Sequence, residues 1–174
     1  MKWDYEFDVV VVGSGNGALT SAICSHDGGA KTLVIEKSNQ YGGTSATSGG
    51  GVWIPNNRYA KAENVDDSDQ DARDYINSVS PEGMIKDELI ETYISEGPKM
   101  IDYLHENSQV KYRNLSHYPD YFPDNPGGKE GNRSMEPEPI NGTILGTDLG
   151  KLREQHPQTA FTMGPINMNF TQVE

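Results

Sequence analysis

FDVVVVGSGNGALTSAICSHDGGAKTLVIEK, residues 7–37, is the stretch that decides the fold of this chain. It opens with Val9–Val12, an unbroken β-branched run that favours a strand buried on both faces of a parallel sheet. A glycine-rich turn follows, then a segment with helical character, Asn16–His26, and a second apolar run, Thr32–Ile35, that ends at Glu36. Strand, glycine turn, helix, strand and acid in this order predict the first βαβ unit of a Rossmann-like α/β fold, which binds a dinucleotide.

The glycine turn after the first strand has the chemistry of a phosphate site. Gly13 permits a tight turn, Gly15 lets the backbone approach a pyrophosphate, and Ala18 is small enough for helix and strand to pack closely. The helix N-terminus would face the phosphates, and Glu36 would accept hydrogen bonds from ribose hydroxyls. A glycine turn in an ordinary α/β protein is the alternative, but it does not explain Glu36. The cofactor-binding residues expected here are Gly13, Ser14, Gly15, Gly17, Ala18, Glu36 and Lys37.

A second glycine-rich loop, GGTSATSGGG at residues 42–51, narrows the cofactor to a flavin. Its five glycines and four hydroxyl residues leave backbone N–H groups bare and offer hydrogen bonds to a polyol or a phosphate. FAD has a ribityl chain and a ring to hold, whereas a nicotinamide cofactor has little need of such a loop. A flexible linker is disfavoured because the apolar stretch Val52–Pro55 follows directly. Within the predicted flavin loop, residues 41–57, the expected contacts are Gly42, Gly43, Thr44, Ser45, Ser48, Gly49, Gly50 and Gly51.

The phrase SGGGVWIPNN, residues 48–57, makes the similarity to a known family specific. The chain resembles the flavoproteins that include fumarate reductases and 3-ketosteroid Δ1-dehydrogenases, and the dehydrogenase branch most closely. This resemblance implies FAD, with Glu36 on the adenosine ribose. Succinate dehydrogenase relatives carry a histidine in the second loop that bonds covalently to the flavin. Because no histidine stands between Tyr41 and Gly51, non-covalent FAD is expected.

Residues 68–108 are expected to form a helical segment inserted after the flavin loop. A cap at its first residue predicts a helix over 68–79. Apolar residues at helical spacing predict a second helix over 86–96 and a third over 99–107. Gly97–Pro98 is expected to separate the last two, because proline interrupts a helix interior.

The segments on either side of these helices are less regular. Residues 58–67 are polar and are interpreted as a surface connection, and residues 110–113 as a short strand. Asp67, Asp69 and Asp71 have the spacing of a calcium loop but lack its glycine and its bidentate glutamate. An acidic helix start explains them better, so no metal site is expected.

The second informative stretch is SHYPDYFPDNPGGKEGNRSMEPEP, residues 116–139. Its five prolines and three glycines argue against a continuous helix or a central strand. Disordered segments usually lack aromatic residues, whereas Tyr118, Tyr121 and Phe122 gather here. An ordered, substrate-facing loop over residues 116–142 is therefore expected, with an aromatic-anchored surface loop as the alternative.

The Tyr118-x-Asp120-Tyr121 pattern resembles a segment of the ketosteroid dehydrogenases. Tyr121 matches their active-site tyrosine, and Tyr118 matches an aromatic position that lines the steroid pocket. The resemblance implies 1,2-dehydrogenation of a 3-ketosteroid: a tyrosinate takes the C2 proton and C1 delivers hydride to flavin N5. Tyr121 would assist the base tyrosine, which lies beyond residue 174. The alternatives are a fumarate-reductase-type flavoprotein acting on another substrate and a truncated FAD-binding fragment without activity.

Composition and length indicate which classes of partner the protein can have and how much of a domain the chain contains. A net charge of −12 argues against nucleic acid and anionic membrane surfaces. No stretch approaches the roughly 18 apolar residues of a membrane span, and the N-terminal residues MKWDYEFD lack the apolar core of a signal peptide, so a cytoplasmic protein is expected. The expected partner is a small-molecule steroid, and the electron acceptor is undefined. Residues 1–174 are interpreted as the N-terminal portion of an FAD-binding domain, because the family supplies further strands.

Overall fold

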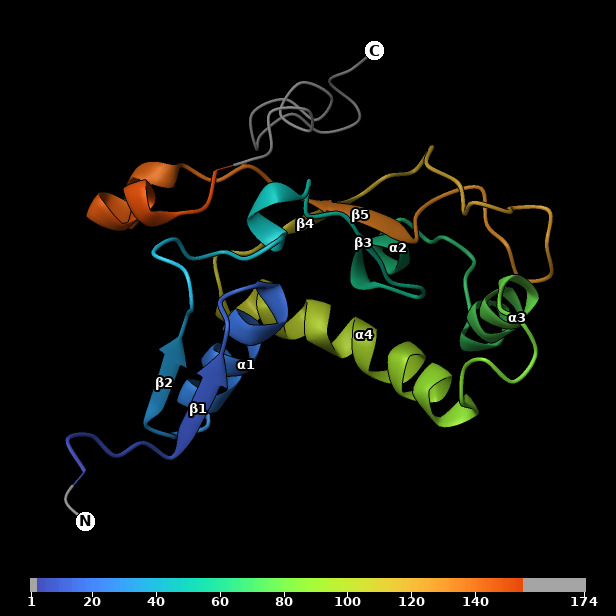
Figure 1. Cartoon of the computed structure of the whole chain (residues 1–174). Coiled ribbons are helices and arrows are strands. Elements are labelled where there is room, and N and C mark those ends of the chain that lie inside the picture. Colours follow the sequence, from blue (N-terminus) through green and yellow to red (C-terminus); the bar gives the residue numbers. More distant parts are fainter. Residues whose placement is uncertain (1–2, 155–174) are drawn as a thin grey trace. The chain divides into compact units, whose positions relative to one another are not determined.

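The computed structural model describes residues 3–154, which form two compact units (Figure 1). One unit combines residues 3–50 with residues 141–154, and the other comprises residues 51–140. Residues 155–174, the last part of the predicted domain portion, lie outside the described residues. None of the helices in residues 3–154 is long and apolar enough to cross a membrane.

The first unit contains the predicted βαβ motif. Strand β1 (Val9–Val12) precedes helix α1 (Asn16–Asp27) and strand β2 (Thr32–Ile35). The two strands pair in parallel, with Val9 opposite Thr32 and Val12 opposite Ile35, and α1 packs against both of them. The α/β fold class and the strand–helix–strand order are therefore confirmed.

The prediction that β1 is buried on both faces is wrong for the described residues. Val9 and Val11 are half-buried, whereas 51% of Val10 and 78% of Val12 are exposed. Within residues 3–154 this sheet has two strands, so neither is flanked on both edges. Alternate side chains of a strand point to opposite faces, and one face of β1 lacks cover here.

The second unit is built on a three-stranded antiparallel sheet in the order β3–β5–β4. Strand β3 is Val52–Trp53, β4 is Tyr112–Asn114 and β5 is Ser134–Pro137. The expectation that the Pro/Gly-rich stretch cannot supply a central strand is wrong, because β5 is the middle strand. Its proline is tolerated because Pro137 is the last residue of the strand, opposite Tyr112, where it interrupts little of the ladder.

Two short helices precede the long one. Residues 58–67 are not only a surface connection: they begin with α2 (Arg58–Ala62), capped by the buried Asn57 side chain, which accepts from the N–H groups of Tyr59 and Ala60. Helix α3 (Asp69–Val79) confirms the predicted helix start. The Ser68 hydroxyl accepts from the N–H of Asp71 at 3.0 Å, as an N-cap should.

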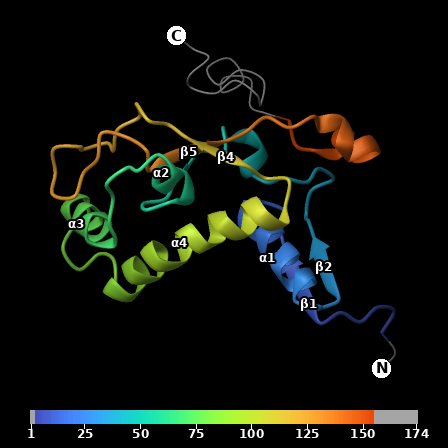
Figure 2. The same ribbon diagram turned by 180° about the vertical axis from the view of Figure 1, so that it is seen from behind.

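Helix α4 (Asp87–Asn107) runs without interruption through Pro98, and Figure 2 shows it as one rod. The predicted break at Gly97–Pro98 is therefore wrong. Packing outweighs the cost of the proline, because this helix buries residues on both sides of it. Gly97 also contributes: an added Cβ would lie 3.3 Å from Ile54 Cδ1, so the missing side chain lets the helix approach β3 closely. The buried residues of α4 are Ile90, Ile94, Ile101 and Leu104.

The core of this unit lies between α4 and the sheet. One cluster joins α4 to all three strands or their flanks, and a smaller one joins α3 to the first half of α4. Continuous burial over both halves of α4 explains why the chain does not turn at Pro98. The first cluster is Ile54, Ile101, Leu104, Tyr112 and Met135, and the second is Ala72, Ile90 and Ile94.

Two glycines of the Pro/Gly-rich stretch allow close backbone contacts, one with α3 and one with the first residue of the stretch itself. Gly127 has φ +72°, and a Cβ there would lie 2.0 Å from the backbone oxygen of Asp71. A Cβ on Gly131 would lie 2.1 Å from the backbone oxygen of Ser116. Only residues without a side chain allow these approaches, so the stretch is ordered by close backbone contacts.

Replacing Gly127 with alanine should destabilise this unit more than the same change at Gly83. Both glycines have φ +72°, but a Cβ on Gly83 meets nothing within 4 Å. Positive φ alone costs about 1 kcal/mol, and the clash in Gly127→Ala should add about 1–3 kcal/mol. Urea unfolding followed by circular dichroism measures both variants, and equal midpoints would contradict the close packing.

Candidate functional site

The glycine turn after β1 leaves the start of α1 open. Gly13 adopts φ +98°, and a Cβ built on Gly13 or Gly17 would meet nothing within 4 Å. Gly15 occupies the N-cap position and supplies no side chain, and Leu19 is the first N–H to bond back, to the Gly15 carbonyl at 2.9 Å. The preceding N–H groups of a helix have no partner within the helix. This end of α1 therefore has the character of an anion-binding position, as predicted, although the N–H of Asn16 already donates to the Ser45 hydroxyl.

Ser14, Glu36 and Gly42 form a hydrogen-bonded knot that joins the glycine turn to the second glycine loop. The Ser14 hydroxyl donates to Glu36 Oε2 at 2.5 Å and accepts from the N–H of Gly42 at 2.9 Å. Ser14 is buried. The side chain predicted to contact the cofactor is therefore committed to the protein, and it sets the distance between the two loops.

Glu36 is held ionised at the end of β2. The Ser14 hydroxyl, and then the N–H of Ser38 at 3.0 Å, lower the pKa of Glu36 below its usual value. The backbone N–H groups of Lys37 and Ser14 lower this pKa further. Glu36 thus carries the negative charge that the predicted ribose contact requires.

The second loop packs directly on the first. A Cβ on Gly43 would lie 3.3 Å from the Cα of Gly15, and one on Gly42, where φ is +108°, would lie 2.7 Å from the Cβ of Ala46. Ser45 accepts from the N–H of Asn16 at 3.0 Å through its hydroxyl. The predicted residues of these two loops are therefore brought together, and the glycines are required by the contact itself.

Two further features of this loop were not predicted. A 3-10 turn, Ser45–Thr47, shapes its middle, and the Ser48 hydroxyl accepts from the N–H of Gly50 at 3.0 Å. Residues 142–151, a 3-10 segment interrupted at Gly146, return beside the loop: Tyr41 bonds to Lys151 and Arg153 through its backbone, at 2.9 and 2.8 Å. The sequence did not predict this return. It predicted only that the substrate-facing loop ends at residue 142.

The residues of the first unit fit the diphosphate and ribose of a dinucleotide. The start of α1 offers N–H groups and its dipole to phosphate, and Glu36 offers an anionic acceptor. The cofactor contacts predicted for the residues of both loops stay predictions, and Gly51 belongs to the other unit.

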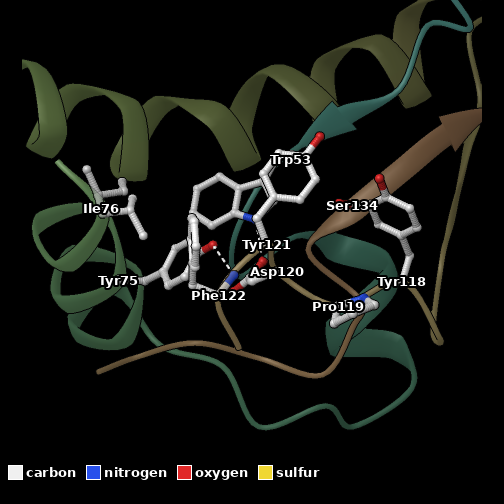
Figure 3. Close-up of a pocket in the computed structure, with 10 residues that line it drawn as sticks. Trp53, Tyr75, Ile76, Tyr118, Pro119, Asp120, Tyr121, Phe122 and Ser134 are labelled. Carbon is white, nitrogen blue, oxygen red and sulfur yellow. Dashed lines mark hydrogen bonds between the residues drawn. The ribbon is translucent and has the colours of Figure 1, made fainter. Parts of the chain in front are cut away.

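The second unit contains a pocket of about 300 Å³ with an aromatic lining (Figure 3). Figure 3 shows Trp53, Tyr75 and Phe122 gathered on one side of it and Tyr118 with Ser134 on the other. Both predicted tyrosines line it, and 82% of Tyr121 is exposed. The lining comprises Trp53, Tyr75, Ile76, Val79, Tyr118, Pro119, Asp120, Tyr121, Phe122 and Ser134.

Three elements, β3, α3 and α4, position this lining. The ring centroid of Trp53 on β3 lies 5.8 Å from that of Tyr75 on α3 and 6.2 Å from that of Tyr93 on α4. The Tyr75 hydroxyl accepts from the N–H of Phe122 at 3.3 Å, so helix α3 holds the loop that bears the tyrosines. Trp53 Nε1 donates to Asp120 Oδ1 at 2.6 Å, so β3 holds it as well.

Tyr118 and Tyr121 interact with each other. A side-chain hydrogen bond to Tyr121, followed by partial burial, raises the pKa of Tyr118 above its usual value. Tyr118 therefore keeps its proton at neutral pH.

Several lining residues were not predicted as site residues. Tyr75, Ile76 and Val79 share one side of α3, a helical spacing that is visible in the sequence. The spacing could identify them as neighbours, but it could not tell which loop they would face. The sequence places Trp53 in an apolar stretch and Asp120 between two tyrosines, but it does not indicate that either residue lines a pocket.

The FAD binding domain family matches residues 8–170 of the chain. The chain belongs to that family. This FAD-binding chain is 40% identical over 163 residues to a 3-oxosteroid 1-dehydrogenase of Mycobacterium tuberculosis, covering 94% of the chain and 28% of that relative. It is 38% identical over 157 residues to a 4-oxocyclohexanecarboxylate 2-dehydrogenase of Sinomonas cyclohexanicum, covering 90% of the chain and 27% of that relative.

A solved structure is similar as well. It is the 3-ketosteroid Δ1-dehydrogenase of Sterolibacterium denitrificans in complex with 1,4-androstadiene-3,17-dione, with a TM-score of 0.82 and 40% sequence identity. The match covers 88% of the FAD-binding chain and 27% of that structure. The chain thus spans under a third of the length of the relatives it matches. The expected family and its FAD cofactor are confirmed.

Substituting Ser14 with alanine should weaken FAD binding about tenfold or more. The change leaves the Gly42 N–H without its acceptor and removes the main donor to Glu36, and an unsatisfied buried group costs about 1–3 kcal/mol. Titration calorimetry of FAD into the apoprotein measures the change. Ser95→Ala, at an exposed hydroxyl on α4, is the control. Equal affinities in the two variants would contradict a role for Ser14 in setting the loops.

Proposed function

We propose that this chain forms the FAD-binding part of a 3-ketosteroid Δ1-dehydrogenase that uses non-covalent FAD. The observation that carries the proposal is the aromatic pocket, about 300 Å³ in volume, whose lining includes both Tyr118 and Tyr121. Forty per cent identity to proteins named 3-oxosteroid 1-dehydrogenase supports it. The absence of histidine between Tyr41 and Gly51 supports the non-covalent attachment.

The proposed reaction removes a hydrogen from each of two adjacent carbons of the steroid A ring. FAD, when bound, supplies the hydride acceptor. Proton removal from C2 requires a base, and a phenol with its usual pKa of about 10 is a poor one unless neighbours assist it. Tyr121 is accessible, and a hydrogen bond to Tyr121 raises the pKa of Tyr118, which therefore keeps its proton at neutral pH. A donated hydrogen bond would stabilise negative charge that develops on the Tyr121 oxygen, so we assign Tyr121 the role of assisting the base.

The chemistry of the pocket favours a steroid over a smaller anionic substrate. Within the described residues its lining contains no lysine, arginine or histidine, and its one charged residue is Asp120. Carboxylate substrates, such as a 4-oxocyclohexanecarboxylate or fumarate, are normally bound by charge-assisted hydrogen bonds. An apolar ring system needs none of these and gains from burial against aromatic side chains. The fumarate-reductase-type alternative is accordingly the weaker one.

Reduction of the bound flavin tests the proposed function. The whole protein, purified with FAD, is mixed anaerobically with 4-androstene-3,17-dione, and loss of the oxidised flavin spectrum is expected. Two other substrates test the alternatives: 4-oxocyclohexanecarboxylate, which would reduce the oxidised flavin, and fumarate, which would reoxidise flavin that dithionite has first reduced. Reaction with either of them but not with the steroid would overturn the proposal. Acid precipitation should release all the flavin, as expected for non-covalent binding. The 174-residue chain alone should not turn the steroid over.

Tyr121→Phe should lower kcat for the steroid by about 10²–10⁴-fold, the usual contribution of a positioned proton-transfer group. Because the aromatic ring remains, KM should change much less. Tyr5→Phe is the control, since Tyr5 is 81% exposed, as Tyr121 is 82% exposed. Steady-state kinetics measure both variants. An unchanged kcat in Tyr121→Phe would exclude Tyr121 from the proton transfer.

A further inference from the structure

Arg133 is the centre of a buried charge cluster beside the aromatic pocket. Its side chain is 1% exposed, and its partners Asp67 and Asp120 are 3% and 2% exposed. Arg133 Nη2 lies 2.6 Å from Asp67 Oδ1, and Arg133 Nη1 lies 2.9 Å from Asp120 Oδ2. Arg133 Nε adds a longer bond of 3.1 Å to Asp67 Oδ2. One guanidinium therefore bridges two carboxylates that come from different segments.

The same guanidinium contacts two walls of the pocket. Its central carbon lies 5.4 Å from the ring centroid of Trp53 and 5.8 Å from that of Tyr75, within the range of cation–π attraction. Asp120 accepts from Trp53 as well as from Arg133. The β3 wall, the α3 wall and the tyrosine-bearing loop are thus all connected through Arg133.

Asp120 transmits this connection to the two tyrosines. It lies next to Tyr121 in the sequence, and it is fixed on three sides: by Arg133, by Trp53 and by Lys129. The N–H of Lys129 donates to Asp120 Oδ2 at 3.0 Å, and the N–H of Asp120 donates to the Lys129 carbonyl at 2.9 Å. With its side chain and backbone held, Asp120 leaves Tyr121 little freedom at its attachment point.

Stability alone does not account for this arrangement. Burying ions costs several kcal/mol each, and apolar residues of similar volume often stabilise a fold as well or better. This cluster also holds two carboxylates against one cation. The geometry, by contrast, requires a planar group with donors in several directions, which arginine provides and lysine does not. A site that needs the forked donors of a guanidinium indicates that this side chain holds its neighbours in fixed positions.

We propose that Arg133 is a positioning residue that fixes the aromatic walls of the pocket and the loop bearing Tyr118 and Tyr121. The inference rests on the proposed function, because the positioned groups are those assigned to the steroid reaction. Arg133 and Asp67 do not line the pocket themselves. Their effect on the reaction would therefore pass through Asp120, Trp53 and Tyr75.

Steady-state kinetics of the flavoprotein with 4-androstene-3,17-dione test the proposal with two variants. Arg133→Lys keeps the charge but loses the fork, and Asp67→Asn keeps the shape but releases one side of the guanidinium. Each should lower kcat at least tenfold, since small displacements of a reacting group can cost about 100-fold. Arg113→Lys is the matched control: Arg113 reaches Glu136 Oε1 with two nitrogens, at 2.7 and 2.6 Å, between β4 and β5, outside the pocket lining. It should change kcat less than twofold.

Activity is expressed per bound FAD, so that misfolded protein does not contribute. If Arg133 only neutralises buried charge, Arg133→Lys would keep kcat within threefold of the wild type, and the proposal would fail. If Arg133→Lys does not retain FAD, the kcat of Asp67→Asn is the test. A wild-type kcat in Asp67→Asn would also overturn the proposal that Arg133 positions the pocket.

A second readout separates this inference from the proposed function. Trp53 is the tryptophan of the pocket lining, so the difference in fluorescence between each variant and the same variant carrying Trp53→Phe reports on Trp53, whatever other tryptophans the whole protein contains. Acrylamide quenching of Trp53 should increase at least twofold in Arg133→Lys and Asp67→Asn and not in Arg113→Lys. A wild-type protein without steroid turnover but with this pattern would refute the steroid function and keep the positioning. Unchanged quenching would refute the positioning.

Discussion

A buried guanidinium must find its counter-charge inside the protein, because water cannot reach it. Arg133 meets this demand with Asp67 and Asp120, which stand 66 and 13 residues away along the chain. Satisfying it brings the start of α3, the tyrosine-bearing loop and the end of the Pro/Gly-rich stretch to one point. Trp53 joins the cluster through Asp120. Two walls of the pocket and the loop that bears Tyr121 therefore meet at this cluster.

The first unit is organised by a smaller constraint of the same kind. Ser14 is buried, and its single hydroxyl joins two loops. The hydroxyl donates to Glu36 and accepts from the N–H of Gly42. The glycines then let the loops approach each other at van der Waals distance. Two glycine loops that look independent in the sequence are thus joined by the side chain of Ser14.

Local propensity failed where packing carried more free energy. Pro98 was expected to end a helix, yet α4 continues because it buries apolar residues on both sides of the proline. Proline-rich composition argued against a central strand, yet β5 pairs on both edges with Pro137 at its last residue. In each case one missing N–H costs little compared with the core that the element completes, built around Ile101 and Met135.

The βαβ unit, the glycine turns, the cap of α3 and the presence of Tyr118 and Tyr121 in one loop could all be predicted from the sequence. These depend on backbone sterics and on contacts between near neighbours, which short patterns record. Only the tertiary structure decided that Arg133 binds Asp67 and Asp120, that Trp53 and α3 wall the pocket, and that β5 lies between β3 and β4. Those features join residues as far apart as Trp53 and Asp120, 67 positions along the chain, and no local pattern specifies which distant carboxylate a buried arginine will choose.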